Sequence, residues 1–247
     1  MKLSPMSVLA VARELRRGQV DVRPLGVAGA RELVPILARE LRAGGRPDAV
    51  VEQAVDSVLC LIWIGEPDEE RLRAASRAGV PIVAVTDAVS VPYVLAEDII
   101  EAPPGQGFPL DEITAAVARR LNEKGAVLAA RLPVLRPAVC RRLIDSYAKR
   151  NAVIAAAVFI PGVDMPILTL NQIRMVLWIA LAFDEAIDRR RSMELLAVVG
   201  AGFGFRTAAR EVLDLVPVGG WAVKGAVAYT GTRAIGEAAV RYFEAIG

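Results

Sequence analysis

Residues that could contact a phosphate or a nucleotide follow two of the apolar runs in the first half of the chain. Gly26 and Gly29 lie in the stretch VRPLGVAGARELV, where an apolar run passes into a helical pattern. Glycines at such a turn let backbone N–H groups approach a phosphate closely. Asp87 follows the apolar run PIVAVT and supplies a carboxylate at the same kind of position. These three residues are the candidate cofactor-binding positions.

The side chains that follow the two glycines differ from those that nucleotide hydrolysis requires. A phosphate-binding loop needs a lysine for the β- and γ-phosphates and a hydroxyl for Mg²⁺, but Arg31 and Glu32 occupy those positions. The carboxylate of Glu32 would repel a phosphate placed beside it. We therefore expect no catalytic residue, no metal site and no bound cofactor, which leaves Gly26, Gly29 and Asp87 as the candidates for contact with a small ligand.

Composition narrows the function classes further. The 247 residues include no histidine, which removes the commonest general base and metal ligand. The 30 basic and 28 acidic residues leave a net charge of +2, so no nucleic-acid partner is indicated. Two cysteines, Cys60 and Cys140, are too few for a zinc site, and Cys60 lies within an apolar run, where we expect a small buried hydrophobe. A reducing cytoplasm is the simplest setting.

A second set of residues surrounds the start of a helix in the C-terminal third. Thr169 precedes Gln172 by three residues, the spacing of a capping box, in which each side chain bonds the other's free backbone N–H. Residues 175–183 carry no charge, so the sequence predicts a helix that begins at Thr169 and is either buried on every side or placed in a membrane. The residues expected to form this loop and cap are Pro161, Gly162, Asp164, Pro166, Thr169, Asn171 and Gln172.

Apolar runs that alternate with helical patterns position the first set of residues. The runs VLCLIWI and PIVAVT are apolar without alternation, which is typical of strands covered on both faces. Strands separated by helices pair in parallel through right-handed crossovers, which predicts an α/β domain with a doubly wound parallel sheet of about four strands. The expected strands are 20–27, 58–64, 81–86 and 98–102, and the expected helices are 30–42, 68–78, 91–96 and 110–122.

The remainder of the chain is expected to be helical. A connector with prolines runs through 125–136, and Pro137 suits the first turn of a long helix that extends to about residue 160. We divide the chain into an α/β domain (1–125), a connector with the start of the long helix (126–149), and a compact all-α domain (150–247). Small residues spaced four apart in the last domain predict close contacts between helices, which would offset the cost of glycine inside a helix.

Two resemblances follow from these stretches. The order VRPLGVAGARELV, VDSVLCLIWIGEPDEERL and PIVAVTD resembles the core of a small Ras-like or Era-like GTPase domain that lacks the diagnostic phosphate and guanine motifs. The order KRNAVIAAAVFIPGVDMPILTLNQIRMVLWIA, VGAGFGFRTAARE and LVPVGGWAVKGAVAYTGTRAIGEAAVRYF resembles the domain of unknown function 697, over residues 145–243. That helical module occurs after GTPase domains and in bacterial proteins linked to the inner membrane. The resemblance implies an arrangement and no catalytic residues.

Three function classes compete on this sequence. The first is a non-catalytic scaffold or regulatory protein, in which a GTPase-like domain without a phosphate-binding loop joins a helical domain that binds a partner or lies near a membrane. The partners that it implies are a GTPase-like protein, a second copy of the chain, or the anionic inner face of the membrane reached from the cytoplasm. The alternatives are a membrane-inserted helical hairpin and an enzyme that binds a nucleotide or small ligand at the sheet edge. Asp184 and Asp214 interrupt the oily runs and argue against the hairpin, so we favour the scaffold.

Overall fold

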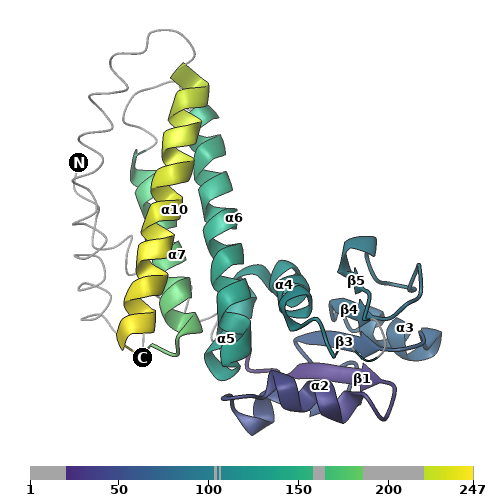
Figure 1. Cartoon of the computed structure of the whole chain (residues 1–247). Coiled ribbons are helices and arrows are strands. Elements are labelled where there is room, and N and C mark those ends of the chain that lie inside the picture. The colour runs from purple at the N-terminus through teal and green to yellow at the C-terminus, as the bar shows by residue number, and fades with distance from the viewer. Residues whose placement is uncertain (1–20, 103–104, 106, 158–164, 186–219, 247) are drawn as a thin grey trace. The chain divides into compact units, whose positions relative to one another are not determined.

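The structure is a computed structural model that describes residues 21–102, 105, 107–157, 165–185 and 220–246 (Figure 1). The described residues form two compact units. One extends to Arg142 and the second begins at Leu143, so the division falls within helix α6 (Arg136–Ala157).

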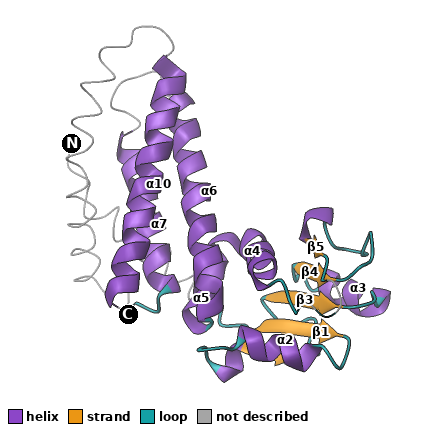
Figure 2. Ribbon diagram, in the orientation of Figure 1, coloured by secondary structure: helices purple, strands orange, loops and turns teal. Residues whose placement is uncertain are grey.

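The first unit is built on a five-stranded parallel sheet in the order β2-β1-β3-β4-β5 (Figure 2). Its strands are β1 (Leu25–Gly29), β2 (Val50–Glu52), β3 (Cys60–Ile64), β4 (Ile82–Val85) and β5 (Ile99–Ile100). The predicted doubly wound parallel sheet is confirmed, with one strand more than expected. The additional strand, β2, has only three residues and only Val50 is buried, so it leaves no apolar pattern in the sequence.

Helices and short 3-10 segments connect the strands. They are α2 (Val34–Leu41), η1 (Pro47–Ala49), α3 (Glu69–Arg77), η2 (Ala96–Asp98), α4 (Leu110–Leu121), η3 (Asn122–Lys124), α5 (Gly125–Arg131) and η4 (Pro133–Leu135). Two expectations are corrected here. Residues 91–95 form a loop where the sequence predicts a helix, and the connector is helical because α5 and η4 occupy it.

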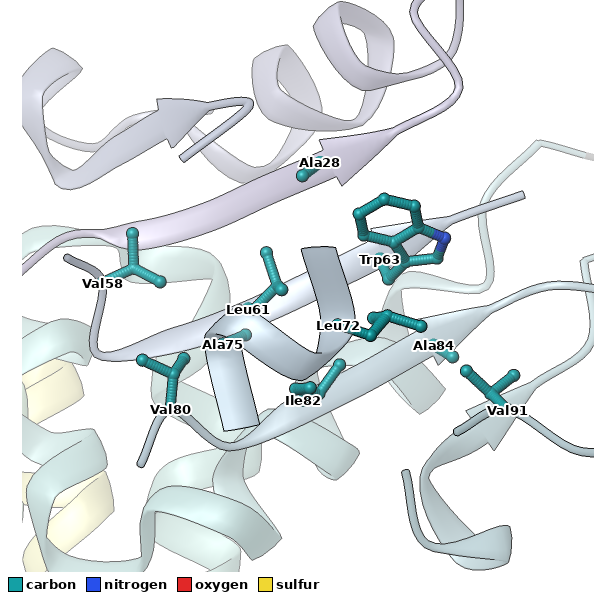
Figure 3. Packing of buried hydrophobic residues seen from close by; sticks show 10 residues of the cluster. All are labelled: Ala28, Val58, Leu61, Trp63, Leu72, Ala75, Val80, Ile82, Ala84 and Val91. Carbon is teal, nitrogen blue, oxygen red and sulfur yellow. The ribbon is translucent and has the colours of Figure 1, made fainter. Parts of the chain in front are cut away.

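Each face of the sheet has its own core. Leu61 and Trp63 of β3 lie beneath Leu72 and Ala75 of α3, and together with neighbouring residues of β1 and β4 they form one buried cluster (Figure 3). The intervening residues, such as Ile62, point to the opposite face because side chains alternate along a strand. Helices α2 and α4 contact the sheet there. Both faces are therefore covered, which accounts for the unbroken apolar runs.

The connection from β2 to β3 has no helix. Residues 53–59 cross β1 directly, and a Cβ placed on Gly26 would lie 2.9 Å from Val58 Cγ2 and 3.0 Å from the Ala54 carbonyl oxygen. A glycine within a strand commonly marks such a close approach of a second backbone. Gly26 is therefore required by packing in the middle of β1.

The second unit consists, among the described residues, of the C-terminal part of α6, α7 (Met165–Ala182) and α10 (Gly220–Ile246), which run side by side (Figure 2). Every residue of 175–182 is buried, which confirms the prediction of a helix covered on all sides. The ring of Phe183, just after α7, stacks on Phe243 of α10 with a centroid separation of 5.7 Å. No described helix is both long and apolar enough to cross a bilayer.

Helix α10 packs through a seam of small residues. Its buried positions are Gly225, Thr232, Gly236, Ala239 and Phe243, a spacing of three, four or seven residues. A repeat of this kind keeps one seam of a helix facing its neighbours. A Cβ on Gly225 would lie 3.3 Å from the Ala152 carbonyl oxygen of α6. Of the pairs spaced four apart, Thr232 and Gly236 are buried at such a contact, whereas Ala222 and Ala226 are exposed.

Alanine substitutions at two glycines of α10 should change the stability of the protein in opposite directions. Gly231 has open space around its Cβ position, so Gly231→Ala should raise the free energy of unfolding by up to about 1 kcal/mol through helix propensity. A Cβ on Gly236 would lie 2.5 Å from Ile144 Cγ1, so Gly236→Ala should lower stability despite the same gain in propensity. Urea unfolding of the full chain measures both. Equal stabilisation by the two substitutions would contradict the close contact at Gly236.

Candidate functional site

In a doubly wound sheet, a ligand binds beyond the carboxyl ends of the strands, where the strand order reverses. That point lies here between β1 and β3, which pair in register from Leu25 with Cys60 to Gly29 with Ile64. The carboxyl edge is the segment 29–34 after β1, Gln53 after β2, Gly65–Asp68 after β3 and Thr86–Ala88 after β4. A nucleotide phosphate would have to contact backbone N–H groups of the first segment.

The backbone donors after β1 already bond within the protein. The N–H of Ala30 donates to the Ile64 carbonyl at 2.9 Å, and those of Leu33 and Val34 both donate to the Ala30 carbonyl. Pro35, the second residue of α2, has no N–H. The N-terminus of α2 therefore offers a phosphate few of the free donors that a phosphate-binding helix supplies.

The side chain of Gln53 covers the backbone of Gly29. Its amide nitrogen donates to the Gly29 carbonyl at 3.3 Å, and its amide oxygen accepts from the Gly29 N–H at 3.5 Å. Arg71 holds it in place by donating to both the backbone and the side-chain oxygen of Gln53, at 2.9 and 3.0 Å. The guanidinium of Arg71 in turn lies 5.1 Å from the centroid of the Trp63 ring, within range of a cation–π interaction.

We refer to Gln53, Arg71 and Trp63 as the edge cover. The Trp63 indole N–H donates to the Glu66 carbonyl at 2.9 Å, which fixes the ring at the end of β3. Gln53 has a φ of +61°, a conformation that costs a residue with a Cβ about 1–2 kcal/mol. The surrounding contacts therefore maintain a strained residue at the position where a ligand would bind.

The three candidate cofactor residues occupy different environments. Gly26 lies inside β1 beneath the crossing segment 53–59, away from the carboxyl edge. Gly29 ends β1 with a φ of +119°, and a Cβ there would lie 2.0 Å from the Ile64 carbonyl oxygen. Asp87 is exposed after β4. Only Gly29 and Asp87 lie at the edge, and the backbone of Gly29 is engaged by Gln53.

Among the acidic residues near the sheet, Asp98 is set apart by its burial. It precedes β5, at the amino end of that strand, and pairs with Arg119 at 3.2 Å and Arg120 at 3.0 Å from α4. Burial raises the pKa of Asp98 above its ordinary value, and the two guanidinium groups oppose that rise. Asp98 therefore anchors α4 beneath the sheet and contributes nothing to the carboxyl edge.

The described residues contain no metal cluster, and the thiol of Cys60 is inaccessible. Cys60 is fully buried, as expected, and burial raises its pKa to about 12, so its thiol is not ionised at neutral pH. The described residues contain no group of three or more metal-ligating side chains.

The loop and cap expected at the start of the central helix take a different form. Helix α7 begins at Met165, so Thr169 lies inside the helix and is not its N-cap. Pro166 lies in the first turn, and Pro161, Gly162 and Asp164 lie outside the described residues. Thr169, Asn171 and Gln172 are all buried.

Asn171 and Gln172 belong to a buried polar network that joins three helices. Asn171 donates to the Asn151 side-chain oxygen of α6 at 2.8 Å, and Asn151 donates to the Thr232 hydroxyl of α10 at 2.9 Å. Gln172 donates to the same hydroxyl at 3.0 Å. We call these four residues the amide network. Because buried polar groups are costly when unpaired, sliding any one helix would leave donors unsatisfied, so the network fixes their register.

The amide network predicts a large effect at Thr232. Thr232→Val keeps the shape of the side chain but removes an acceptor shared by Asn151 and Gln172, so the free energy of unfolding should fall by about 1–3 kcal/mol. Thr230→Val is the matched control, because the exposed Thr230 hydroxyl bonds only carbonyls of its own helix. Denaturant unfolding compares the two variants. Similar small losses in both would contradict the register-fixing role.

Comparison of the chain with known protein families, curated proteins and solved structures finds no match. The resemblances to a GTPase core and to the domain of unknown function 697 thus stay predictions from the sequence.

Proposed function

We propose that this chain is a non-catalytic scaffold or regulatory protein. In this proposal the sheet unit is a GTPase-like domain that has lost nucleotide binding, and the helical unit binds a partner or lies close to a membrane. The protein acts in the cytoplasm, at the inner face of the membrane when a partner or the anionic surface holds it there. A GTPase-like protein or a second copy of the chain is the expected protein partner.

The edge cover is the observation that supports this proposal most strongly. Gln53 engages both polar groups of the Gly29 peptide, and Arg71 is committed to Gln53 and Trp63. A bound phosphate needs unengaged N–H groups and a cation directed toward it. At the carboxyl edge the Gly29 N–H and the Arg71 guanidinium are both already bonded to Gln53. The negative charge of Glu32 would in addition repel a phosphate.

The helical unit supports binding rather than chemistry. The amide network consists of three amide side chains and one hydroxyl that bond one another, so its role is to hold the helices in register. A rigid arrangement of three helices with one defined register suits a surface that a partner recognises.

The proposal predicts that nucleotides do not bind. A ligand present at one hundred times its dissociation constant stabilises a protein by about 2.7 kcal/mol, which a thermal melt detects readily. We expect the melting temperature of the full chain to be unchanged by millimolar GTP or ATP with Mg²⁺. A saturable rise with either nucleotide would overturn the non-catalytic interpretation and favour the ligand-binding enzyme.

A further inference from the structure

The loop that connects β4 to β5 starts at the carboxyl edge and exposes large apolar side chains. Within residues 86–95, Val89 is 98% exposed, Leu95 50% and Tyr93 47%. The loop is anchored to the sheet, because Val91 belongs to the buried core cluster (Figure 3). Ala88 and Val94 pack against that cluster. Apolar residues gathered on one loop commonly mark an interaction site.

Hydrogen bonds hold the Tyr93 side chain and the start of the loop in place. The Tyr93 hydroxyl accepts a hydrogen bond from Arg73 of α3 at 3.1 Å, and the Ala88 N–H donates to the Thr86 hydroxyl. Tyr93 has a φ of +65°, a strained conformation for a residue with a bulky side chain. Strain maintained by specific contacts on an exposed apolar loop points to a role in recognition, because a rigid loop loses little entropy on binding.

The charges beside these side chains are acidic. Residues 86–97 contain Asp87 and Glu97 and no lysine or arginine. The end of β3 lies next to this loop, since the Gly65 N–H donates to the Val85 carbonyl, and it adds the exposed carboxylates of Glu66 and Asp68.

The basic groups nearest to this loop are already engaged. Arg71 is bound to Gln53, and Arg73 pairs with Glu69 as well as with Tyr93. Arg119 of α4 donates to the Glu97 carbonyl at 2.6 Å and pairs with Asp98 at 3.2 Å. The exposed carboxylates of Asp87 and Glu66 at the start of the loop therefore favour a cationic partner over an anionic membrane surface.

We propose that Val89, Tyr93 and Leu95, with the surrounding carboxylates, form a docking surface for a basic amphipathic segment of a partner protein. Apolar side chains of the segment would cover the three exposed residues, and its lysine or arginine side chains would lie against Asp87 and Glu66. The inference rests on the proposed scaffold function, because it assigns the carboxyl edge to a protein partner instead of a nucleotide.

The test measures binding of a fluorescein-labelled leucine–lysine amphipathic peptide to the full chain by fluorescence anisotropy. We expect saturable binding that weakens with ionic strength, and no binding of a matched leucine–glutamate peptide. The double variant Val89→Ser, Leu95→Ser should bind about tenfold more weakly or worse. The control Ile36→Ser removes an exposed apolar residue of α2 and should bind like the wild type.

Several outcomes would overturn the inference. Equal binding by the loop variant and the wild type would show that the loop is not the site. Flotation with phosphatidylglycerol vesicles that the loop variant loses would assign the loop to a bilayer instead. Neither result would be evidence for nucleotide binding. A rise in melting temperature with GTP would overturn the scaffold function, but it would not change the peptide result. Failure of the docking surface and failure of the proposed function are therefore distinguishable.

Discussion

The sheet unit depends on how the chain passes from one side of β1 to the other. The segment 53–59 must run back along β1 by about four residues and cross from β2 to β3, which is two strand spacings. The straight-line distance from Gln53 to Leu59 is therefore roughly 16 Å. The seven residues 53–59 would span only about 10 Å as a helix, but about 23 Å when extended. The segment must therefore be extended and lie flat on β1, which leaves no room for a side chain at Gly26.

The same constraint places Gln53 at the carboxyl edge. The segment begins where β2 ends, beside Gly29, and its first residue adopts a positive φ to turn across the sheet. Its side chain then meets the Gly29 peptide, and Arg71, reaching from α3 over Trp63, completes the cover. The crossing of β1 by this segment thus explains both why residue 26 must be glycine and why the Gly29 peptide is already hydrogen-bonded. Partner binding at the neighbouring β4 loop needs no change in this arrangement.

The sequence is informative where burial on both faces leaves a continuous pattern. The runs that form β3 and β4 and the helix 110–121 are predicted within one or two residues, because each buries a strand or a full helical face. The strand β2 escapes prediction because it is short and only its first residue is buried. Gly26 resembles a ligand-contacting glycine in the local sequence, since nothing there shows that residues thirty positions later lie on top of it.

The Thr169–Gln172 spacing shows a second limit. Residues three apart share a helix face whether they lie at its start or within it, so the capping pattern cannot be told from an interior polar pair. The interior polar pair is distinguished from a cap by its partners Asn151 and Thr232, which lie on other helices about 20 and 60 residues from Gln172 along the chain. Partners so distant in the sequence leave no local signal. Close packing in α10 is predictable because small residues at regular spacing let a second helix backbone approach, and they would otherwise only weaken the helix.

The most direct test of the edge cover is a double-mutant cycle of Gln53→Ala and Arg71→Ala in the full chain, measured by urea unfolding. If the two side chains act as one unit over the Gly29 backbone, the loss in the double variant should fall short of the sum of the single losses by at least about 0.5 kcal/mol. Additive losses would mean that Gln53 and Arg71 do not support each other. The edge cover would then not act as one unit over the Gly29 backbone, and the observation that most strongly supports the proposed loss of nucleotide binding would fail.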